Sequence, residues 1–496
     1  MNGEEFRIWG KKMVDFVADY WDGLRERKPI HDVKPGYIWD LVPNEPPEAA
    51  EAWENVFKDL ESVVLSPSTH WHHPHFFAYY PTACSYQSIV ADILSGGIAC
   101  IGFTWNSSPS CTELEMVMLD WLAKMLDLPE HFLNSEPGFG GGIIQGTASE
   151  ATYVALLAAR GRMLSKLKEK DKTSSNGVLI KWGRAAWNRL YSTFKSSSDL
   201  QSAHPKLVAY CSDQAHSSVE KAGLLGGVVT RKLKTFKENK YGLTGETLQE
   251  AIEADLAEGL VPFFVCATVG TTTCCAIDDV SKMGEVCEKY QLWLHVDAAY
   301  AGSAAVCPEY RYLLNGLEFA DSFNYNPHKW QMINFDCSAM WFKDTREVES
   351  AFLVDPLYLK HEHQKSAVPD YRNWQIPLGR RFRSLKIWFV LRTMGVTGIQ
   401  NNIRKQCSLA QQFGKLVEAD PRFELFLPVN LGLVCFRLKG QNALTEQLLK
   451  RINEDKRIHL VPSFTNDTYY LRLAICSTKT TVDDLNFAWK VITDFT

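Results

Sequence analysis

The sequence predicts an α/β protein in which a large domain is built on a mostly parallel β-sheet and a smaller α/β domain follows it. Three apolar runs, at residues 207–210, 262–268 and 292–296, carry this prediction, because strands that are buried on both faces lack polar alternation. Polar residues follow each run, as expected at the edge where open sheets bind ligands. With 496 residues the chain exceeds one ordinary core, so we expect two or three domains.

Composition and charge narrow the classes of protein to consider. Hydrophobic residues make up 46% and charged residues 22%, as in soluble globular proteins, and the net charge of −5 argues against a nucleic-acid-binding protein. No apolar run is long enough to span a bilayer, and the N-terminus lacks the basic and apolar regions of a signal peptide. The thirteen cysteines are scattered and odd in number, which favours reduced thiols and a cytoplasmic location.

A helix is predicted at the N-terminus, because apolar side chains recur there at spacings of three and four residues. This stripe comprises Phe6, Trp9, Met13, Phe16, Val17, Tyr20 and Leu24. The stripe can pack on a second subunit or on its own chain, and the sequence leaves both possibilities open. Residues 30–50 are rich in Pro, Gly and acidic residues, which indicates a connector.

Residues 69–82 combine histidines with aromatic side chains. The histidines are His70, His72, His73 and His75. They suggest a metal site, but no cysteine or acidic ligand accompanies them. We therefore favour the wall of a ligand pocket, which aromatic side chains commonly form.

A further helix is predicted from Thr112, which with Glu115 fits a capping box. Its predicted buried face comprises Leu114, Val117, Met118, Trp121, Leu122 and Met125. Residues 161–206, by contrast, are rich in Lys, Ser, Asn and Arg, which indicates an exposed helix followed by a mobile loop.

A glycine run at residues 138–142 leads into another predicted helix, which starts near Thr147. Glycines let the backbone approach a ligand, and a helix N-terminus offers N–H groups to an anion. Ser149 adds a hydroxyl donor. Helix capping explains Thr147 and Glu150 but not the glycines, so we favour phosphate binding. The spacing matches neither a Walker loop nor a dinucleotide fingerprint, which disfavours a nicotinamide dehydrogenase.

Two residues define the predicted chemistry. Asp297 ends a buried strand, at the edge where open α/β sheets bind ligands. Lys329 follows a second strand-like run at residues 321–326, in a position where a buried ammonium can lose its proton and act as a nucleophile. A Schiff-base lysine and an aspartate for a pyridinium nitrogen are the groups that pyridoxal phosphate (PLP) chemistry requires. His216 lies just past a third strand end, on the same side of the sheet.

The motifs His-Val-Asp-Ala-Ala-Tyr, ending at Tyr300, and Asn-Pro-His-Lys-Trp, ending at Trp330, resemble those of the PLP-dependent group II decarboxylases. The resemblance covers almost the whole chain except residues 161–206, and is greatest to animal members that act on aromatic amino acids. It implies the aspartate aminotransferase-like architecture called fold type I, and a homodimer with active sites at the interface. It also implies an N-terminal helical dimerisation segment (1–85), a large PLP-binding domain (86–385) and a small C-terminal domain (386–496).

The resemblance assigns site residues position by position. Catalysis is expected from Lys329, Tyr358, His216 and Asp297, with Tyr358 on a lid as the acid for the carbanion carbon. Cofactor contacts are expected from Ala148, Ser149, His216, Thr272, Asp297, Ala299, Ser322, Asn326, His328 and Lys329. Substrate contacts are expected from Trp71, Tyr79, Tyr80, Pro81, Thr82, Ile101, Phe103, His216 and Gly379.

The resemblance implies decarboxylation of an aromatic L-amino acid, such as L-DOPA or 5-hydroxytryptophan, to its amine. Gly379 favours catechol and indole side chains, since histidine decarboxylases resemble this chain but favour serine there. Tyr80, where many relatives carry phenylalanine, leaves the ring specificity open. Decarboxylation of histidine or of tyrosine alone is therefore an alternative.

Two other outcomes stay open. Some relatives form aldehydes oxidatively, and these tend to replace the histidine at 216 or the lid tyrosine, so retention of His216 and Tyr358 favours simple decarboxylation. A catalytically silent protein that binds PLP or only a protein partner is disfavoured by the intact Lys329, Asp297 and Ser149.

Overall fold

The computed structural model describes residues 1–172, 206–354 and 368–496. These residues form two compact units, each with its own hydrophobic core. The first unit comprises residues 1–81 and 405–496, and the second comprises residues 82–404. The three functional segments expected from the sequence, divided at residues 85 and 385, stay a prediction.

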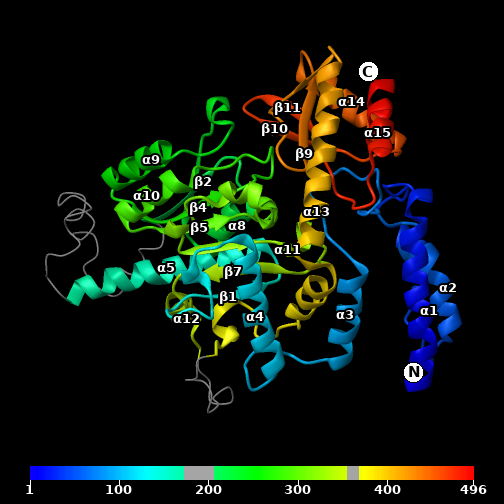
Figure 1. The fold of residues 1–496 in the computed structure, drawn as a ribbon, viewed down its shortest axis with the longest axis horizontal. Helices are drawn as coiled ribbons and strands as arrows, with labels where there is room; N and C mark the ends of the chain where they lie inside the picture. The colour runs from blue at the N-terminus through cyan, green and yellow to red at the C-terminus, as the bar shows by residue number, and fades with distance from the viewer. Residues whose placement is uncertain (173–205, 355–367) are drawn as a thin grey trace. The chain divides into compact units, whose positions relative to one another are not determined.

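The second unit is built on a seven-stranded sheet with the order β1-β7-β6-β5-β4-β2-β3 (Figure 1). Its strands are β1 (Gly141–Gln145), β2 (Leu207–Ser212), β3 (Val229–Leu233), β4 (Val261–Thr268), β5 (Trp293–Asp297), β6 (Ser322–Tyr325) and β7 (Ser338–Phe342). Strands β2 to β6 pair in parallel, whereas β7 runs antiparallel to both β6 and β1. The three apolar runs form β2, β4 and β5, so the predicted mostly parallel sheet is confirmed.

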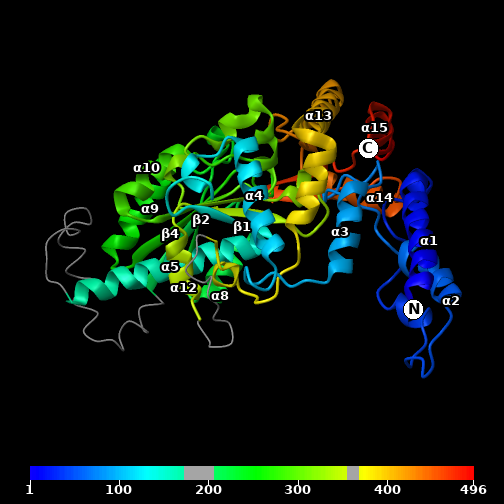
Figure 2. The same cartoon turned by 60° about the horizontal axis from the view of Figure 1, so that its bottom comes forward.

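Helices cover both faces of this sheet (Figure 2). On one face, α5 (Ala148–Lys172) packs against α8 (Ser217–Gly226) and α12 (Thr345–Phe352). On the other face, α9 (Gly245–Ala257) packs against α10 (Val280–Tyr290). The chain crosses the sheet in one direction from β2 to β3 and in the opposite direction from β3 to β5. Right-handed crossovers therefore place α8 on the face opposite to α9 and α10.

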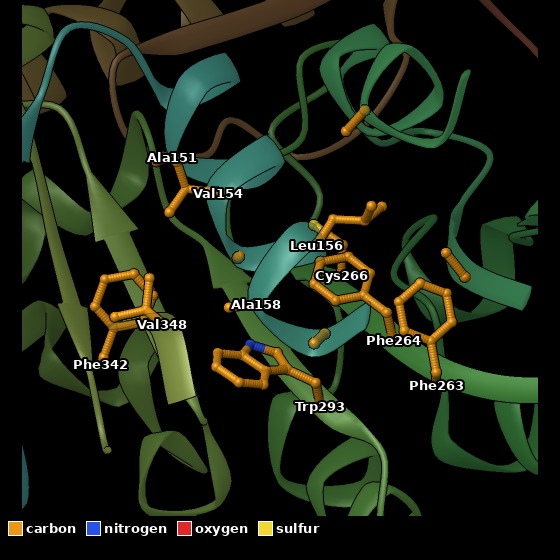
Figure 3. Packing of buried hydrophobic residues seen from close by; sticks show 14 of the residues in the cluster. Ala151, Val154, Leu156, Ala158, Phe263, Phe264, Cys266, Trp293, Phe342 and Val348 are labelled. Atoms are coloured by element: carbon orange, nitrogen blue, oxygen red, sulfur yellow. The ribbon is translucent and has the colours of Figure 1, made fainter. Parts of the chain in front are cut away.

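The core of the second unit lies between α5 and the sheet (Figure 3). Its buried members include Ala151, Val154, Ala158, Phe264 and Trp293. The guanidinium carbon of Arg162, on α5, lies 4.6 Å from the centroid of the Trp293 ring. Side chains four residues apart on a strand point to the same face, so Asp297 shares with Trp293 the face that α5 covers.

The remaining helices of the second unit are α3 (Tyr86–Ile98), α4 (Pro109–Leu126), α11 (Pro327–Trp330) and the start of α13 (Ser384–Ala419). The capping box predicted at Thr112 and Glu115 was wrong, because α4 begins three residues earlier. Ser108 holds the N-cap position and Pro109 the first turn, where a missing N–H has no consequence.

Glu115 instead forms a buried ion pair with Arg380, in which neither side chain is more than 1% exposed. The same carboxylate oxygen accepts the Ile144 N–H at 2.7 Å. The pair therefore joins α4, β1 and the segment that precedes α13.

Arg380→Met is expected to lower the free energy of unfolding by about 3–5 kcal/mol, because it leaves the Glu115 charge buried and unpaired. Denaturant unfolding measures this loss. The double variant with Glu115→Gln removes the orphaned charge and keeps an acceptor for Ile144, so it should recover most of the stability. Equal stability of the single and double variants would contradict the ion-pair explanation.

The first unit contains a four-stranded antiparallel sheet with the order β10-β11-β9-β8. Its strands are β8 (Phe423–Leu425), β9 (Leu433–Leu438), β10 (Val461–Thr465) and β11 (Thr468–Ala474), and its helices are α1 (Gly3–Asp22), α2 (Trp53–Asp59), the end of α13, α14 (Asn442–Asp455) and α15 (Val482–Asp494). The predicted N-terminal helix is confirmed as α1, which Asn2 caps. Phe16 of α1 contacts Phe57 of α2 edge to face, yet α1 contains no buried residue.

Three of the four histidines at residues 70–75 bond protein groups through their rings. His70 Nδ1 bonds the Tyr20 hydroxyl at 3.0 Å, His75 Nε2 bonds Asp484 at 3.0 Å, and His73 Nδ1 accepts the backbone N–H of His75. In the described ranges, no group of three or more His, Cys, Asp or Glu has an arrangement that could hold a metal ion. None of the helices in those ranges combines the length and the apolarity that a membrane crossing requires.

Candidate active site

Asp297 occupies the carboxyl end of β5, on the face that α5 covers. Its side chain is only 4% exposed. The Ala299 N–H donates to Oδ1 at 3.0 Å, so the turn after the strand fixes the orientation of the carboxylate. The sequence thus places a buried acid at the edge of the sheet where α/β proteins bind ligands.

Lys329 lies on α11, directly after β6, and its side chain is half-buried. Both neighbours of Lys329 are held in place. His328 Nδ1 accepts the Cys337 N–H at 2.8 Å, and the Trp330 ring stacks on Tyr300 with 4.6 Å between centroids. Burial, and then the charge of Lys329, lower the pKa of His328 to about 3, so this imidazole is neutral.

His216 connects the two predicted catalytic groups electrostatically. Burial lowers the pKa of His216. The charge of Asp297 raises this pKa and the charge of Lys329 lowers it, so each of the two groups acts electrostatically on the imidazole. His216 is also the N-cap of α8, since Nδ1 accepts the Ser218 N–H at 3.1 Å. With Nδ1 occupied as an acceptor, the proton of the neutral ring is on Nε2, which is a hydrogen-bond donor.

The N-terminus of α5 lies at the same edge of the sheet. Strand β7 is antiparallel to both β1 and β6, so β1 and β6 run in the same direction. Because α5 follows β1 in the chain, it begins at the edge of the sheet where β6 also ends. The predicted cap is present, because Thr147 Oγ1 accepts the Glu150 N–H at 3.2 Å. Ser149 is exposed and Ala148 is half-buried in the first turn. A helix N-terminus with an accessible hydroxyl is suited to an anion.

The other predicted cofactor residues divide into two groups. Asn326 is 2% exposed at the edge, and its Oδ1 has no hydrogen-bond partner within the described residues. Thr272 and Ala299 are half-buried in the turns after β4 and β5. Ser322 lies at the opposite, amino end of β6, where its Oγ accepts the Trp293 indole N–H at 2.8 Å and bonds His295. The hydroxyl of Ser322 is therefore engaged inside the sheet and away from the edge.

Four predicted substrate residues belong to the first unit. Trp71 and Tyr79 are exposed and stack on each other with 5.2 Å between ring centroids. Tyr80 is buried, and the guanidinium carbon of Arg472 lies 4.9 Å from its ring centroid. Pro81 is buried beside it in the sequence. The assignment of these residues to substrate binding stays a prediction.

The remaining predicted substrate residues belong to the second unit. Thr82 and Phe103 are half-buried, and Ile101 is 55% exposed. A Cβ added at Gly379 would meet only Ile101 Cγ2, at 3.8 Å, among the described residues. The structure therefore leaves room for a side chain at position 379. The predicted lid, including Tyr358, lies mostly outside the described residues, as does most of the 161–206 segment, although residues 161–172 continue α5.

Sequence reasoning missed three buried polar residues that surround Asp297. Thr268 on β4 and Asn324 on β6 stand opposite Asp297 in the strand register, and His295 precedes it on β5. The signal in the sequence was the presence of polar residues inside otherwise apolar strands. Once the strands are aligned, these residues project to the same face of the sheet as Asp297.

Comparisons with known proteins agree with this geometry. A family model described as the pyridoxal-dependent decarboxylase conserved domain matches residues 35–182 and 182–439. The chain is 55% identical over 494 residues to the aromatic-L-amino-acid decarboxylase of Manduca sexta, covering 100% of this chain and 92% of that protein.

Two solved structures have the same fold over the whole chain. Tryptophan decarboxylase of Catharanthus roseus, solved in complex with L-tryptophan, has a TM-score of 0.89 at 36% identity. The 4-hydroxyphenylacetaldehyde synthase of Rhodiola rosea has a TM-score of 0.87 at 34% identity. In each comparison 100% of this chain and 98% of the solved chain are covered.

Proposed function

Because the chain belongs to the pyridoxal-dependent decarboxylase family, we propose that it converts aromatic L-amino acids, such as L-DOPA or 5-hydroxytryptophan, to their amines and carbon dioxide. The observation that carries this proposal is the placement of Asp297, Lys329 and His216 at the carboxyl ends of β5, β6 and β2, at one edge of a fold type I sheet. Amine and carbon dioxide yields over a panel of aromatic amino acids and histidine test it. Release of amine from none of the aromatic substrates would overturn it.

The residues at the edge of the sheet fit PLP. Lys329 supplies an amine for the aldehyde, Asp297 a buried carboxylate for the ring nitrogen, and the N-terminus of α5 donors for the phosphate. The Oδ1 of buried Asn326 has no partner in the part of the chain that the structure describes, which is a further sign of a polar ligand at this edge. PLP supplies the sink for the electron pair that is released when a bond at the substrate Cα breaks.

The protein residues decide which bond breaks and where protons go. Asp297, when ionised, would hold a proton on the ring nitrogen of the cofactor. His216 has only Nε2–H left to donate, and this donor is suited to orienting the substrate carboxylate. Lys329 would hold the cofactor covalently through its side-chain amine and would give up that bond to the substrate amine. Tyr358 is proposed, from its position in the sequence, to protonate the substrate carbon after loss of carbon dioxide.

Gly379→Ser is expected to move the ratio of kcat/KM for L-DOPA to kcat/KM for L-histidine by roughly tenfold toward histidine, the scale of one added group in a pocket. The change is sterically tolerated, since an added Cβ meets only Ile101. Initial-rate kinetics with both substrates measures the ratio. Gly379→Ala is the matched variant that separates added volume from the hydroxyl. An unchanged ratio in both variants would remove Gly379 from the substrate pocket.

We also propose that the enzyme is a homodimer of this chain. Helix α3 and the residues after it expose a row of apolar side chains, and Val117 and Trp121 of α4, predicted as core, are 45% and 41% exposed. The exposed row comprises Tyr86, Val90, Ile93, Leu94, Ile98 and Ile101. Apolar patches of this kind mark contacts with a partner. Sedimentation of the holoenzyme as a monomer at micromolar concentration would contradict the dimer.

Oxidative formation of an aldehyde is the second candidate, and the likeness to 4-hydroxyphenylacetaldehyde synthase favours testing it. Retention of His216 and Tyr358 favours the decarboxylase. Peroxide release in step with turnover would identify an aldehyde synthase. A cytoplasmic location is also part of the proposal, because the thirteen cysteines are scattered along the chain and odd in number, which favours reduced thiols. Recovery of the protein mainly from a secreted fraction would contradict that location.

A further inference from the structure

Asp297 is flanked on both sides by buried polar side chains of the neighbouring strands. In the strand register Asp297 stands opposite Thr268 of β4 and Asn324 of β6, and His295 stands opposite Ser322 of β6. Neighbouring strands are about 4.8 Å apart, and residues in register project to the same face. All five side chains therefore lie together on the face of the sheet that α5 covers.

These neighbours are buried without the partners that buried polar groups require. Asn324 and His295 are 0% exposed and Thr268 is 4% exposed. Within the described residues, Asn324 Oδ1 and Nδ2, Thr268 Oγ1 and His295 Nε2 have no hydrogen-bond partner. An unsatisfied polar group inside a protein lowers stability, so such groups persist where a function needs them. The polar group that both Thr268 and Asn324 stand opposite is the Asp297 carboxylate.

The hydrogen bonds of Trp293 and Ser322 indicate which nitrogen of the His295 ring carries the proton. The Trp293 indole can only donate, and it donates to Ser322 Oγ at 2.8 Å. Ser322 Oγ also lies 2.8 Å from His295 Nδ1, the one acceptor that its hydroxyl proton has among the described residues, so we assign the proton to this bond and the imidazole proton to Nε2. Burial lowers the pKa of His295 to about 4, so the ring is neutral.

Asn324 is the next polar side chain after Trp293, Ser322 and His295 in this row. Its side chain raises the pKa of His295 as a hydrogen-bond partner does, although the two side chains lie outside strict hydrogen-bond geometry. An Nε2–H donor at His295 would attract the Asn324 Oδ1, and that orientation would leave the Nδ2 donors of Asn324 on the side of Asp297.

We propose that Asn324 and Thr268 are positioning residues that donate hydrogen bonds to the Asp297 carboxylate, and that His295 and Ser322 orient Asn324. This inference rests on the proposed function, because it assigns Asp297 to the cofactor ring nitrogen. Hydrogen bonds to the charged form stabilise a carboxylate. The two donors fix the plane of the Asp297 carboxylate, and this positioning would keep the ring nitrogen protonated and the electron sink strong.

The test uses the holoenzyme loaded with PLP that carries ¹⁵N at its ring nitrogen. Asn324→Leu and Thr268→Val remove the donors with little change of volume, and Thr268→Ser restores the hydroxyl. Thr230→Val removes from β3 of the same sheet a buried hydroxyl that has no partner among the described residues. The ¹⁵N shift gives the pH midpoint at which the ring nitrogen loses its proton. Steady-state kinetics with L-DOPA gives kcat and KM, and thermal unfolding monitors folding.

We expect Asn324→Leu and Thr268→Val each to lower the midpoint by roughly one pH unit and kcat by roughly tenfold, with KM within about twofold. Thr268→Ser should restore wild-type behaviour, and Thr230→Val should leave both quantities unchanged. A wild-type midpoint in folded Asn324→Leu and Thr268→Val, or equal losses in Thr230→Val, would overturn the inference. If Asn324→Leu fails to fold, the midpoints of Thr268→Val, Thr268→Ser and Thr230→Val still test the inference. A wild-type protein that binds PLP but forms no amine contradicts the proposed function, whereas the midpoint still tests the inference.

Discussion

Replacing Lys329 with alanine is expected to abolish turnover, with a loss of roughly 10⁴-fold or more in kcat. A single general acid or base contributes about 10²–10⁴-fold, and the proposed role of Lys329 as the covalent anchor of the cofactor has no substitute in alanine. The backbone of α11 should survive the change, because His328 and Trp330 hold it through Cys337 and Tyr300. Amine formation from L-DOPA measures the loss.

Borohydride reduction followed by peptide mass spectrometry gives a second, independent readout of the same variant. The wild-type protein should carry the reduced cofactor on Lys329, and Lys329→Ala should carry none at this position. Lys282→Ala is the matched control, since Lys282 is an exposed lysine of α10 that pairs with Glu285. Normal amine production by Lys329→Ala would end the assignment of this residue as the covalent anchor.

The local pattern of apolar residues was sufficient to predict the strands, because strands of a parallel sheet are buried on both faces and are therefore apolar along their whole length. It was also sufficient for Asp297, which lies at the end of such a run. It failed at Thr112 and Glu115, where a capping pattern occurs inside a helix that Ser108 and Pro109 start earlier. Glu115 is explained instead by Arg380, which is distant in sequence and is brought close by the fold.

The groups around Asp297 could not be predicted in the same way, because they depend on strand order and register. Thr268 and Asn324 flank Asp297 only when β4 and β6 pair with β5 in the observed alignment. Ser322 illustrates the same limit. The motif resemblance assigns Ser322 to the cofactor, and that assignment stays a prediction, but local pattern gave no sign that the hydroxyl lies at the amino end of β6 and contacts Trp293 and His295.

Asp297→Asn is expected to lower kcat by on the order of 10³-fold, the scale of a lost electrostatic contact in an enzyme site. The amide keeps the shape and can still accept the Ala299 N–H, but it carries no charge to hold a proton on the ring nitrogen. Asp297→Glu keeps the charge and displaces it, so it should lose less. The protonation state of the ring nitrogen and kcat with L-DOPA should change together across the three proteins.

The pH dependence gives a separate check on the same variant, through His216. Asp297 raises the pKa of His216, so its removal lowers that pKa further below the ordinary range. Since the neutral imidazole with Nε2–H is the proposed active form, activity is lost as the pH falls through the His216 pKa. The acidic limb of the kcat/KM profile should therefore move to lower pH in Asp297→Asn. A shift of that limb to higher pH would show that Asp297 and His216 do not share a site.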